Sequence, residues 1–546
     1  MATVSSLLRE RVTLQVRSVD RLFLHGYLPT LQTPGQLVRF LLDRGYPIPS
    51  PALLGHEVRR YAIAVERFAR HQNVPMVRFA RDAVKEDVAR PHFAQAERDG
   101  RFGVVLVGVA QEKASVWRGW RHGGSDTHPH FEYGRQSAHV NYYYFYIRDP
   151  QWGPTFVKTL AYAPYGVWLY LNGHEWAKRQ AEQAGLGYQA LDNGFRATAD
   201  ADALAAICGR LSVADVDAFC ERWQARLPSP LTAADQRRGH RYALAFRQLE
   251  ISDTRVLDRP ATARAWFEQT LHDQLALGHP DEVQLVFGRR VSRRTPGRFR
   301  TRVITRGVDP ALYAHYKHSK VKQYLKEGCA LRTETTVNNT YDFGIGRLVT
   351  DANWQALLEI GHAVNERLLT QELAACPCAP DPTALQRIVL PSTHDGQPAP
   401  GLRFGDPRVM ALLLCLCHFQ HLFRGLTNRS LRELVADLIP DYGARQATYD
   451  LRRLRRKGMI RRIARSNHYE LTSEGRRTAI FFTKTYTRIV NPSLAELDPR
   501  LPPEIADRSP LSRGWRAYET ALDERIATAT IHAQQPAPRR EKLTSP

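Results

Sequence analysis

Residues 404–490 carry the most restrictive pattern in the chain, because three helical periods are followed by two short alternating stretches and a fourth helical period. Apolar residues that recur every three or four positions predict a helix, whereas alternation predicts a strand. A short polar turn between two alternating stretches is typical of a β-hairpin. The expected elements are helices over residues 409–422, 430–439 and 444–457 and strands over residues 459–464 and 468–472. The pattern therefore predicts a small helical domain with one hairpin.

The third of these helices is strongly basic. Leu451 and Leu454 lie three residues apart and predict a buried edge, while arginines occupy much of the remaining surface. Since an α-helix fits the major groove of duplex DNA, a cationic helix beside a basic hairpin is suited to DNA binding. The residues expected to contact DNA in this segment are Arg445, Arg452, Arg453, Arg455, Arg456, Lys457 and Arg465.

The stretch TYDLRRLRRKGMIRRIARSNHYELTSEGRR resembles the recognition helix, wing and following helix of MarR-like transcription regulators. The resemblance implies a winged helix-turn-helix that binds duplex DNA. The alternative is a hairpin that packs on the protein's own body and arginines that form a solvated face, since winged helices also serve as protein-binding modules.

The net charge of +22 is concentrated in two blocks. Residues 288–326 contain eight Arg and four Lys against one Asp, a net of +11, and residues 441–488 contain thirteen basic and four acidic residues, a net of +9. Concentrated basic surfaces attract polyanions. We therefore expect a second nucleic-acid contact in the central block, through Arg293, Arg294, Arg298 and Arg300. DNA is the expected partner, and RNA remains open for the central block.

The length of 546 residues predicts several domains, and helical and strand-like patterns that follow one another along the chain predict an α+β multidomain protein with mixed sheets in its N-terminal and central regions. No apolar run approaches the ~18 residues of a membrane helix, so no membrane partner is expected. Seven sparse cysteines argue against a disulfide framework and predict a cytoplasmic protein. With DNA as the expected partner, it is expected to be nucleoid-associated. No internal repeat is apparent. The expected divisions are an N-terminal α+β domain (1–230), a central basic α+β domain (231–373), a linker (374–403), a winged-helix domain (404–492) and a partly disordered C-terminal extension (493–546).

A candidate reaction centre lies in the central basic block. A strand with Tyr324 and Lys326 is followed by a Gly328 turn and a strand with Arg332 and Glu334. Residues two apart on a strand share a face, so the last pair point the same way. This hairpin resembles the Tyr-x-Lys and Arg-x-Glu pattern of rolling-circle replication initiators. The resemblance implies that these four residues, Tyr324, Lys326, Arg332 and Glu334, are catalytic, with Glu334 also a metal ligand.

Two further carboxylates complete the expected metal site. Asp20 lies in a stretch similar to the initiators' first metal-binding strand, and Glu112 ends an apolar strand. Cleavage of a phosphodiester needs a nucleophile and an ion that carboxylates hold, so we expect Mg²⁺ or Mn²⁺ bound by Asp20, Glu112 and Glu334. No nucleotide cofactor is expected, because glycine-rich phosphate-binding motifs are missing from the sequence. The alternative is a structural ion pair between Arg332 and Glu334.

Along the whole chain, the order DRLFLHG, VNYYYFYI, LNGHEWAKRQ, LRTETTVNN and the C-terminal segment resembles a group of uncharacterised, multi-copy bacterial proteins. The resemblance is compatible with a mobile genetic element. The predicted function is therefore a DNA-binding, metal-dependent nicking or strand-transfer enzyme, similar to a transposase or replication initiator. The alternative is a non-enzymatic MarR-like transcription regulator whose large N-terminal region senses or oligomerises. The oligomeric state stays open.

Overall fold

The computed structural model of the chain describes residues 10–124, 129–277, 282–285, 300–306, 309–375, 380–394, 396–418, 421–464 and 466–486, with isolated positions beyond residue 489. Its contacts divide the chain into two compact units. The first comprises residues 1–377 with 419–425, and the second comprises residues 378–418 with 426–546. The first unit is built around one large sheet, and the second is mainly helical.

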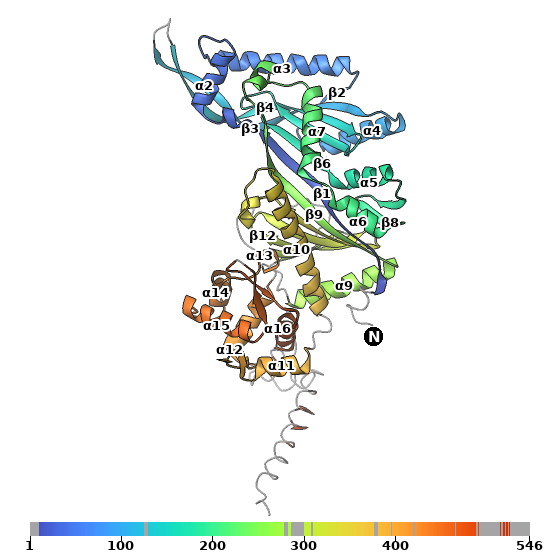
Figure 1. The fold of residues 1–546 in the computed structure, drawn as a ribbon, viewed down its shortest axis with the longest axis vertical. Coiled ribbons are helices and arrows are strands. Elements are labelled where there is room, and N and C mark those ends of the chain that lie inside the picture. The colour runs from blue at the N-terminus through green and yellow to red at the C-terminus, as the bar shows by residue number, and fades with distance from the viewer. Residues whose placement is uncertain are drawn as a thin grey trace, which may run out of the picture. The chain divides into compact units, whose positions relative to one another are not determined.

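A mixed sheet of twelve strands organises the first unit (Figure 1), in the order β10-β11-β12-β13-β14-β9-β1-β6-β5-β4-β3-β2. The β2–β3 and β10–β11 pairs at its two ends are parallel, and the pairs between them are antiparallel. The strands are β1 (Val12–Tyr27), β2 (Met76–Arg78), β3 (Gly103–Gly124), β4 (Pro129–Asp149), β5 (Gly153–Leu160), β6 (Val167–Asn172), β9 (Ala243–Leu257), β10 (Glu282–Leu285), β11 (Arg300–Arg306), β12 (Asp309–Tyr316), β13 (Ser319–Lys326) and β14 (Ala330–Val337). The predicted α+β class is confirmed, and the mixed sheets expected in the N-terminal and central regions form one large mixed sheet.

The sheet consists of two six-stranded halves with the same topology. In each half the first strand lies beside the last: β1 pairs with β6, and β9 pairs with β14. The other strands follow toward the edge of the sheet in reverse chain order, as β6-β5-β4-β3-β2 in one half and β14-β13-β12-β11-β10 in the other. In each half the edge strand, β2 or β10, runs parallel to its neighbour. The sequence shows no such repeat, because the shared feature is the backbone pairing and not the identity of the side chains.

The β1–β9 pair joins the two halves into one continuous sheet. The division expected near residue 230 therefore does not separate two sheets, and the N-terminal and central regions belong to one unit. A long antiparallel pairing between residues about 230 positions apart gives no local signal in the sequence, since strand partners are chosen in three dimensions.

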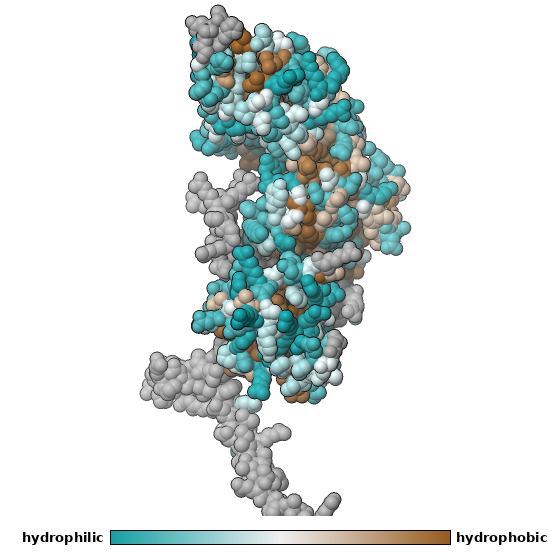
Figure 2. Space-filling model, turned by 60° about the vertical axis from the view of Figure 1, so that its left-hand side comes forward, coloured by the Kyte–Doolittle hydropathy of each residue, from teal (hydrophilic) through white to brown (hydrophobic). Residues whose placement is uncertain are grey.

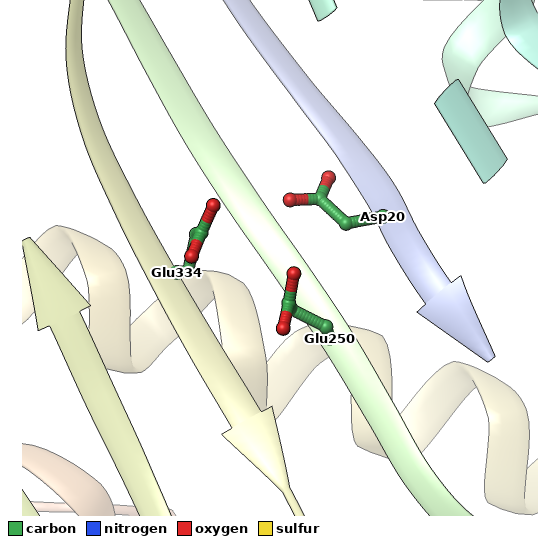
Figure 3. A group of neighbouring side chains, drawn as sticks. All are labelled: Asp20, Glu250 and Glu334. Atoms are coloured by element: carbon green, nitrogen blue, oxygen red, sulfur yellow. The ribbon is translucent and has the colours of Figure 1, made fainter. Parts of the chain in front are cut away.

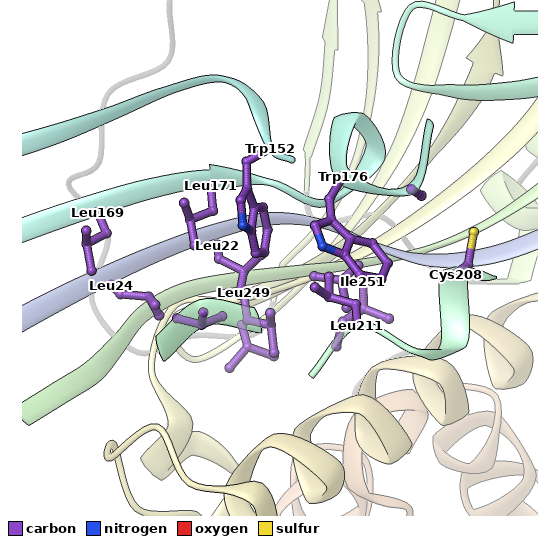
Figure 4. Packing of buried hydrophobic residues seen from close by; sticks show 14 of the residues in the cluster. Leu22, Leu24, Trp152, Leu169, Leu171, Trp176, Cys208, Leu211, Leu249 and Ile251 are labelled. Carbon is purple, nitrogen blue, oxygen red and sulfur yellow. The ribbon is translucent and has the colours of Figure 1, made fainter. Parts of the chain in front are cut away.

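Helices cover the core side of the sheet. Helices α3 and α7 pack on the half that begins with β1, and α9 and α10 pack on the half that begins with β9. Leu22, Leu169, Leu249 and Ile251 project from neighbouring strands into this core (Figure 4). The helices of this unit are α2 (Pro34–Asp43), α3 (Ala52–His71), α4 (Lys85–Arg98), α5 (Gly173–Gln183), α6 (Ala201–Gly209), α7 (Val213–Arg226), α8 (Ala233–Arg237), α9 (Pro260–Leu277), α10 (Asp351–Ala375) and α13 (His421–Arg424).

The other side of the sheet carries a second apolar cluster and several buried charged side chains. Helix α4 packs over its outer strands, where Tyr144 and Tyr146 are buried. A small hairpin of β7 (Tyr188–Leu191) and β8 (Gly194–Thr198) lies over its middle, because the Asn193 carbonyl accepts a hydrogen bond from Arg332 on β14. We call this side the polar face.

The second unit contains helices and two short hairpins. Its elements are α11 (Pro382–Val389), β15 (Ser392–His394), β16 (Gln397–Ala399), α12 (Pro407–Leu416), α14 (Asn428–Ala436), α15 (Ala444–Arg456), β17 (Ile460–Arg462), β18 (Tyr469–Leu471) and α16 (Ser473–Thr485). The expected helices and hairpin all have counterparts, whereas the winged-helix assignment stays a prediction. The expected linker (374–403) contains α11 and the β15–β16 hairpin. Most of the expected extension (493–546) lies outside the described residues.

The face of the molecule in Figure 2 is mainly hydrophilic, and hydrophobic residues form smaller patches on it. Within the described parts of the chain, no helix combines the length and the apolar character that crossing a bilayer requires.

Candidate functional site

The central strands bring three acidic side chains together on the polar face. Asp20 on β1, Glu250 on β9 and Glu334 on β14 point toward one another (Figure 3), and one carboxylate oxygen from each lies within 4.8 Å of the others. The register of β1 against β9 shifts around Asp20, which is the extra residue of a β-bulge. The bulge lets Asp20 and Arg21 both face the polar side while Leu22 enters the core. We call Asp20, Glu250 and Glu334 the acidic trio.

Arg332 on β14 neutralises much of this negative charge. The residue is 0% exposed, contacts Asp20, and donates from Nε to Glu334 Oε1 at 2.5 Å. Its Nη1 donates to the Asn193 carbonyl at 2.6 Å and to Thr254 Oγ1 at 2.8 Å. A buried ion network of this kind is costly to break, because loss of one partner leaves an uncompensated charge.

The start of helix α5 reaches the site through one glycine. Asn172, the last residue of β6, caps the helix by accepting hydrogen bonds from the backbone N–H groups of His174 and Glu175. A Cβ at Gly173 would lie 2.0 Å from the Val19 carbonyl oxygen, so only glycine permits this close approach. The approach places the next residue, His174, beside the acidic trio.

His174 completes the buried part of the site. Its Nε2 lies 3.0 Å from Asp20 Oδ1 and 2.7 Å from Arg332 Nη2. Burial lowers the pKa of His174 although Asp20 opposes the change, so the ring is neutral near pH 7. The neutral Nε2 can donate to Asp20 or accept from Arg332, depending on the tautomer, and in either case His174 adds no charge to the site.

Strand β13 supplies Tyr324 and a lysine. The Tyr324 hydroxyl donates to Glu334 Oε1 at 2.7 Å. Lys322 lies directly across the strands from Glu334, and its Nζ is 3.7 Å from the centre of the Tyr324 ring. Lys326, the lysine expected at the site, instead forms an ion pair with Asp192 at 2.9 Å. Lys322 therefore occupies the position that the sequence analysis gave to Lys326.

Charge within the acidic trio is unevenly balanced. Burial opposes ionisation of Asp20, but the charge of Arg332 and hydrogen bonds with His174 and Ser252 hold the pKa of this carboxyl well below its ordinary value. Glu250 is buried beside Glu334 and Asp20, and this environment raises the pKa of Glu250 to about 7. The excess negative charge of the site therefore lies on the side of Glu250.

The chemistry of Glu250 and Glu334 fits a divalent ion. Mg²⁺ takes carboxylate oxygens and usually keeps several water ligands, so two protein carboxylates suffice. These two residues would hold the ion while Arg332 stays paired with Asp20. A bound ion would neutralise phosphate oxygens and lower the pKa of a bound water.

Glu112, the other expected metal ligand, belongs to a different cluster on β3. Its carboxylate accepts hydrogen bonds from Lys85 at 2.7 Å, Lys158 at 2.5 Å and Tyr144 at 2.5 Å. Burial opposes its ionisation, but these donors lower the pKa of Glu112 to about 2. The structure therefore places Glu250, and not Glu112, in the acidic trio. We call Glu112, Lys85, Lys158 and Tyr144 the Glu112 cluster.

The central basic block is described in part. Arg293, Arg294 and Arg298 lie outside the described residues, and Arg300 is described only as the first residue of β11. Nearer the trio, the Nζ atoms of Lys320 and Lys322 lie 5.7 and 5.9 Å from the ring centre of Tyr313 on β12. Cationic and aromatic groups thus alternate on this part of the polar face.

In the second unit, three of the residues expected at DNA hold a neighbouring segment instead. Lys457 is 0% exposed and donates to the Arg387 carbonyl at 2.9 Å. Arg453 donates to the backbone carbonyls of Pro400 and Gly401, and Arg456 donates to that of Pro398. Lys457 is therefore unavailable to DNA in this conformation, and the two arginines would have to exchange internal partners for phosphates.

The remaining basic residues of α15 face solvent. Arg445, Arg452 and Arg455 are exposed, and Tyr449 is exposed on the same stripe of the helix. Spacings of four, three and three residues place these side chains along one helical face. Arg465 lies outside the described residues.

The sequence analysis identified Asp20, Tyr324, Arg332 and Glu334, which the structure brings together, but missed three neighbours. Lys322 lies two residues before Tyr324 on β13, so strand periodicity alone would have placed both side chains on one face. Glu250 and His174 reach the site through the β1–β9 pairing and the Gly173 contact, for which the sequence holds no local signal.

Comparison with known proteins identifies no relative: no family model, no curated protein and no solved structure matches the chain.

Proposed function

We propose that this chain is a DNA-binding protein of a mobile genetic element that nicks or transfers DNA strands at its acidic trio with Mg²⁺ or Mn²⁺. The observation that carries the proposal is the convergence of Asp20, Glu250 and Glu334 beside the Tyr324 hydroxyl. A divalent ion held by Glu250 and Glu334 would neutralise the oxygens of a phosphodiester and orient it for displacement.

Two nucleophiles fit the proposed reaction. If the Tyr324 oxygen attacks phosphorus, a phosphotyrosyl bond forms, the bond to the departing nucleotide oxygen breaks, and the phenol proton passes to Glu334, its acceptor at 2.7 Å. If an ion-bound water attacks, no protein adduct forms. Burial and the nearby Glu334 charge raise the pKa of Tyr324, so the phenol is protonated near pH 7 and the water route is favoured.

The surroundings of the trio support a nucleic-acid substrate. Arg21 is exposed at its edge, and Lys322 lies at its other side. On the neighbouring strands, Tyr170 stacks on Phe156 with ring centres 5.2 Å apart, and both residues are partly exposed. Cations with partly exposed aromatic rings are typical of surfaces that hold phosphates and unpaired bases.

The second unit supports duplex binding. The winged-helix interpretation makes α15 the recognition helix, and its exposed stripe of Arg445, Tyr449, Arg452 and Arg455 has the chemistry for phosphate and base contacts. Such binding would tether the chain to duplex DNA.

A regulator without chemistry is the second candidate, and one observation favours it. Arg332 already pairs with Asp20 and Glu334, as expected of a structural ion network. In that function the trio stabilises the sheet, and the first unit senses a signal or oligomerises.

Divalent-dependent cleavage by the purified full chain tests the enzymatic proposal. Single-stranded and duplex DNA carrying the chain's own genomic flanks are incubated with Mg²⁺ or Mn²⁺. Glu334→Gln should abolish cleavage and keep DNA affinity within about threefold, because it removes an ion ligand and little phosphate attraction. Asp87→Asn, an exposed carboxylate on α4, is the matched control and should cleave normally. A folded, DNA-bound wild-type chain that does not cleave would support the regulator instead.

Tyr324→Phe distinguishes the two nucleophiles. A tyrosine nucleophile gives a covalent protein–DNA adduct in the wild type that the variant cannot form. An ion-bound water gives no adduct in either protein, and the variant retains cleavage.

A further inference from the structure

A cavity of about 490 Å³ lies between the core side of the sheet and helix α7. Its apolar lining consists of Val157, Val167, Leu169 and Leu244 from the sheet with Trp223 and Leu227 from the end of α7. Val167 and Leu244 are partly exposed although they adjoin the hydrophobic core, so α7 covers this part of the sheet incompletely. The volume falls within the roughly 300–1,000 Å³ of small-molecule sites.

The cavity lies on the opposite side of the sheet from the acidic trio. Side chains alternate along a strand, so Leu249 enters the core while its neighbour Glu250 joins the trio. Leu169, in the cavity lining, belongs to the same core cluster as Leu249. A ligand in the cavity therefore does not depend on the proposed cleavage of DNA.

Helix α7 presents acidic groups at the cavity mouth. Asp217, Glu221 and Gln224 are spaced by four and three residues along one stripe of the helix and line the cavity. Both carboxylates are exposed, and neither forms an ion pair with a described residue. Burial, Glu221 and Asp351 at the start of α10 raise the pKa of Asp217, which indicates an excess of negative charge there.

The basic lining residues do not cancel this charge. His240 is buried, and its Nδ1 lies 2.8 Å from Thr30 Oγ1, so the ring is engaged by the protein. Arg241 is exposed, and within the described part of the chain it forms no ion pair with Asp217 or Glu221. In a chain whose net charge is +22, an acidic mouth over an apolar floor is a local exception.

We propose that this cavity is a binding site for an amphipathic organic cation. The apolar body of the ligand contacts Val167, Leu169 and Leu244, where it removes partly exposed apolar surface from water. The cationic head lies at Asp217 and Glu221, where it relieves the repulsion between like charges. Charge complementarity selects a cation over a neutral or anionic molecule of the same apolar shape.

Calorimetric titration of the full chain tests this site with two probes that share an apolar body. They are 4-phenylbutyltrimethylammonium, which is cationic, and 4-phenylbutanol, which is neutral. We expect the cation to bind at least about fivefold more tightly, the advantage that two partly screened charges provide. The double variant D217N/E221Q should remove this advantage and leave the affinity for the alcohol within about twofold. Asp202→Asn, an exposed carboxylate on α6, is the matched control and should change neither affinity.

Variants that fill the cavity test whether the probes bind there. Leu244→Trp should weaken both probes by more than about tenfold, because the indole occupies the apolar floor. Val167→Phe serves the same purpose if Leu244→Trp unfolds, and near-ultraviolet circular dichroism identifies a folded variant. The proposal is overturned if the two probes bind equally, if a folded cavity-filled variant retains wild-type affinity, or if neither probe binds at ~1 mM.

Discussion

The two charged clusters on the polar face contain similar residues but differ in charge balance. In the Glu112 cluster one carboxylate accepts hydrogen bonds from two lysines, Lys85 and Lys158. In the acidic trio the buried Arg332 pairs with Asp20 and Glu334, whereas Glu250 has only the exposed Arg21, at 3.9 Å, as its ion-pair partner. The pKa of Glu112 is accordingly lowered to about 2 by its donors despite burial, whereas burial and neighbouring carboxylates raise the pKa of Glu250 to about 7. The cations of the Glu112 cluster therefore balance its carboxylate, whereas the acidic trio can accept another cation.

The clusters also lie in different parts of a repeated topology. The Glu112 cluster occupies the outer strands of the half that begins with β1, and the trio lies where the two halves meet at β1 and β9. The same strand order thus supports a closed ion network at one place and an unbalanced one at another. The backbone topology positions side chains, and the residues at each position decide the chemistry.

Replacement of Arg332 should cause the largest change in stability of the variants that test this comparison. Arg332→Met should lower the free energy of unfolding of the first unit by about 3–5 kcal/mol, because it leaves buried carboxylates without their cation. Chemical denaturation at pH 7 measures the loss, with Arg118→Met, an exposed arginine on β3, as the control. A loss below about 1 kcal/mol would mean that the network is not a structural necessity.

Glu112→Gln should have a smaller effect of about 2 kcal/mol at pH 7, because it leaves the buried Lys158 with a weaker partner. The folded pKa of Glu112 is below the unfolded value, so its stabilising contribution is present above about pH 4.5 and is lost as the pH falls toward 2. The difference between wild type and variant should shrink over that window. A difference that is independent of pH would contradict the ionic origin of the stabilisation.

Sequence patterns predicted the α+β class and the Arg332 and Glu334 face because these depend on local periods of two and 3.6 residues. The repeat, the bulge at Asp20 and the arrival of Glu250 depend on which strands pair, and no local pattern encodes that choice. Glu112 was grouped with Asp20 and Glu334 for the same reason: the sequence predicts a strand that ends at Glu112, but this residue lies in the middle of β3, and its lysine neighbours come from other elements. In α15 the charge was predicted correctly, but Lys457 is buried by a segment that was expected to be a linker.

Glu250→Gln should change stability in the opposite direction. The folded pKa of Glu250 is about 7, above its unfolded value, so the carboxyl holds a proton in the folded state that it loses on unfolding. Wild-type stability should consequently fall, relative to the variant, by on the order of 2 kcal/mol between pH 5 and pH 8. Denaturation curves of both proteins across this range measure the slope. Parallel pH profiles would show that Glu250 carries no excess negative charge.

The smallest expected effect distinguishes the clusters most directly. An ion that binds only the folded trio stabilises the chain by about 1.4 kcal/mol when its free concentration is ten times its Kd. Thermal unfolding with Mn²⁺ should show this stabilisation in the wild type and in Glu112→Gln, and Glu250→Gln should lose it, since the ion requires the Glu250 carboxylate. The stabilisation should strengthen from pH 6 to pH 8, because the ion competes with the proton that Glu250 binds with a pKa of about 7. Equal stabilisation of all three proteins would place the ion elsewhere on the chain. Stabilisation lost only in Glu112→Gln would reverse the assignment of the two clusters.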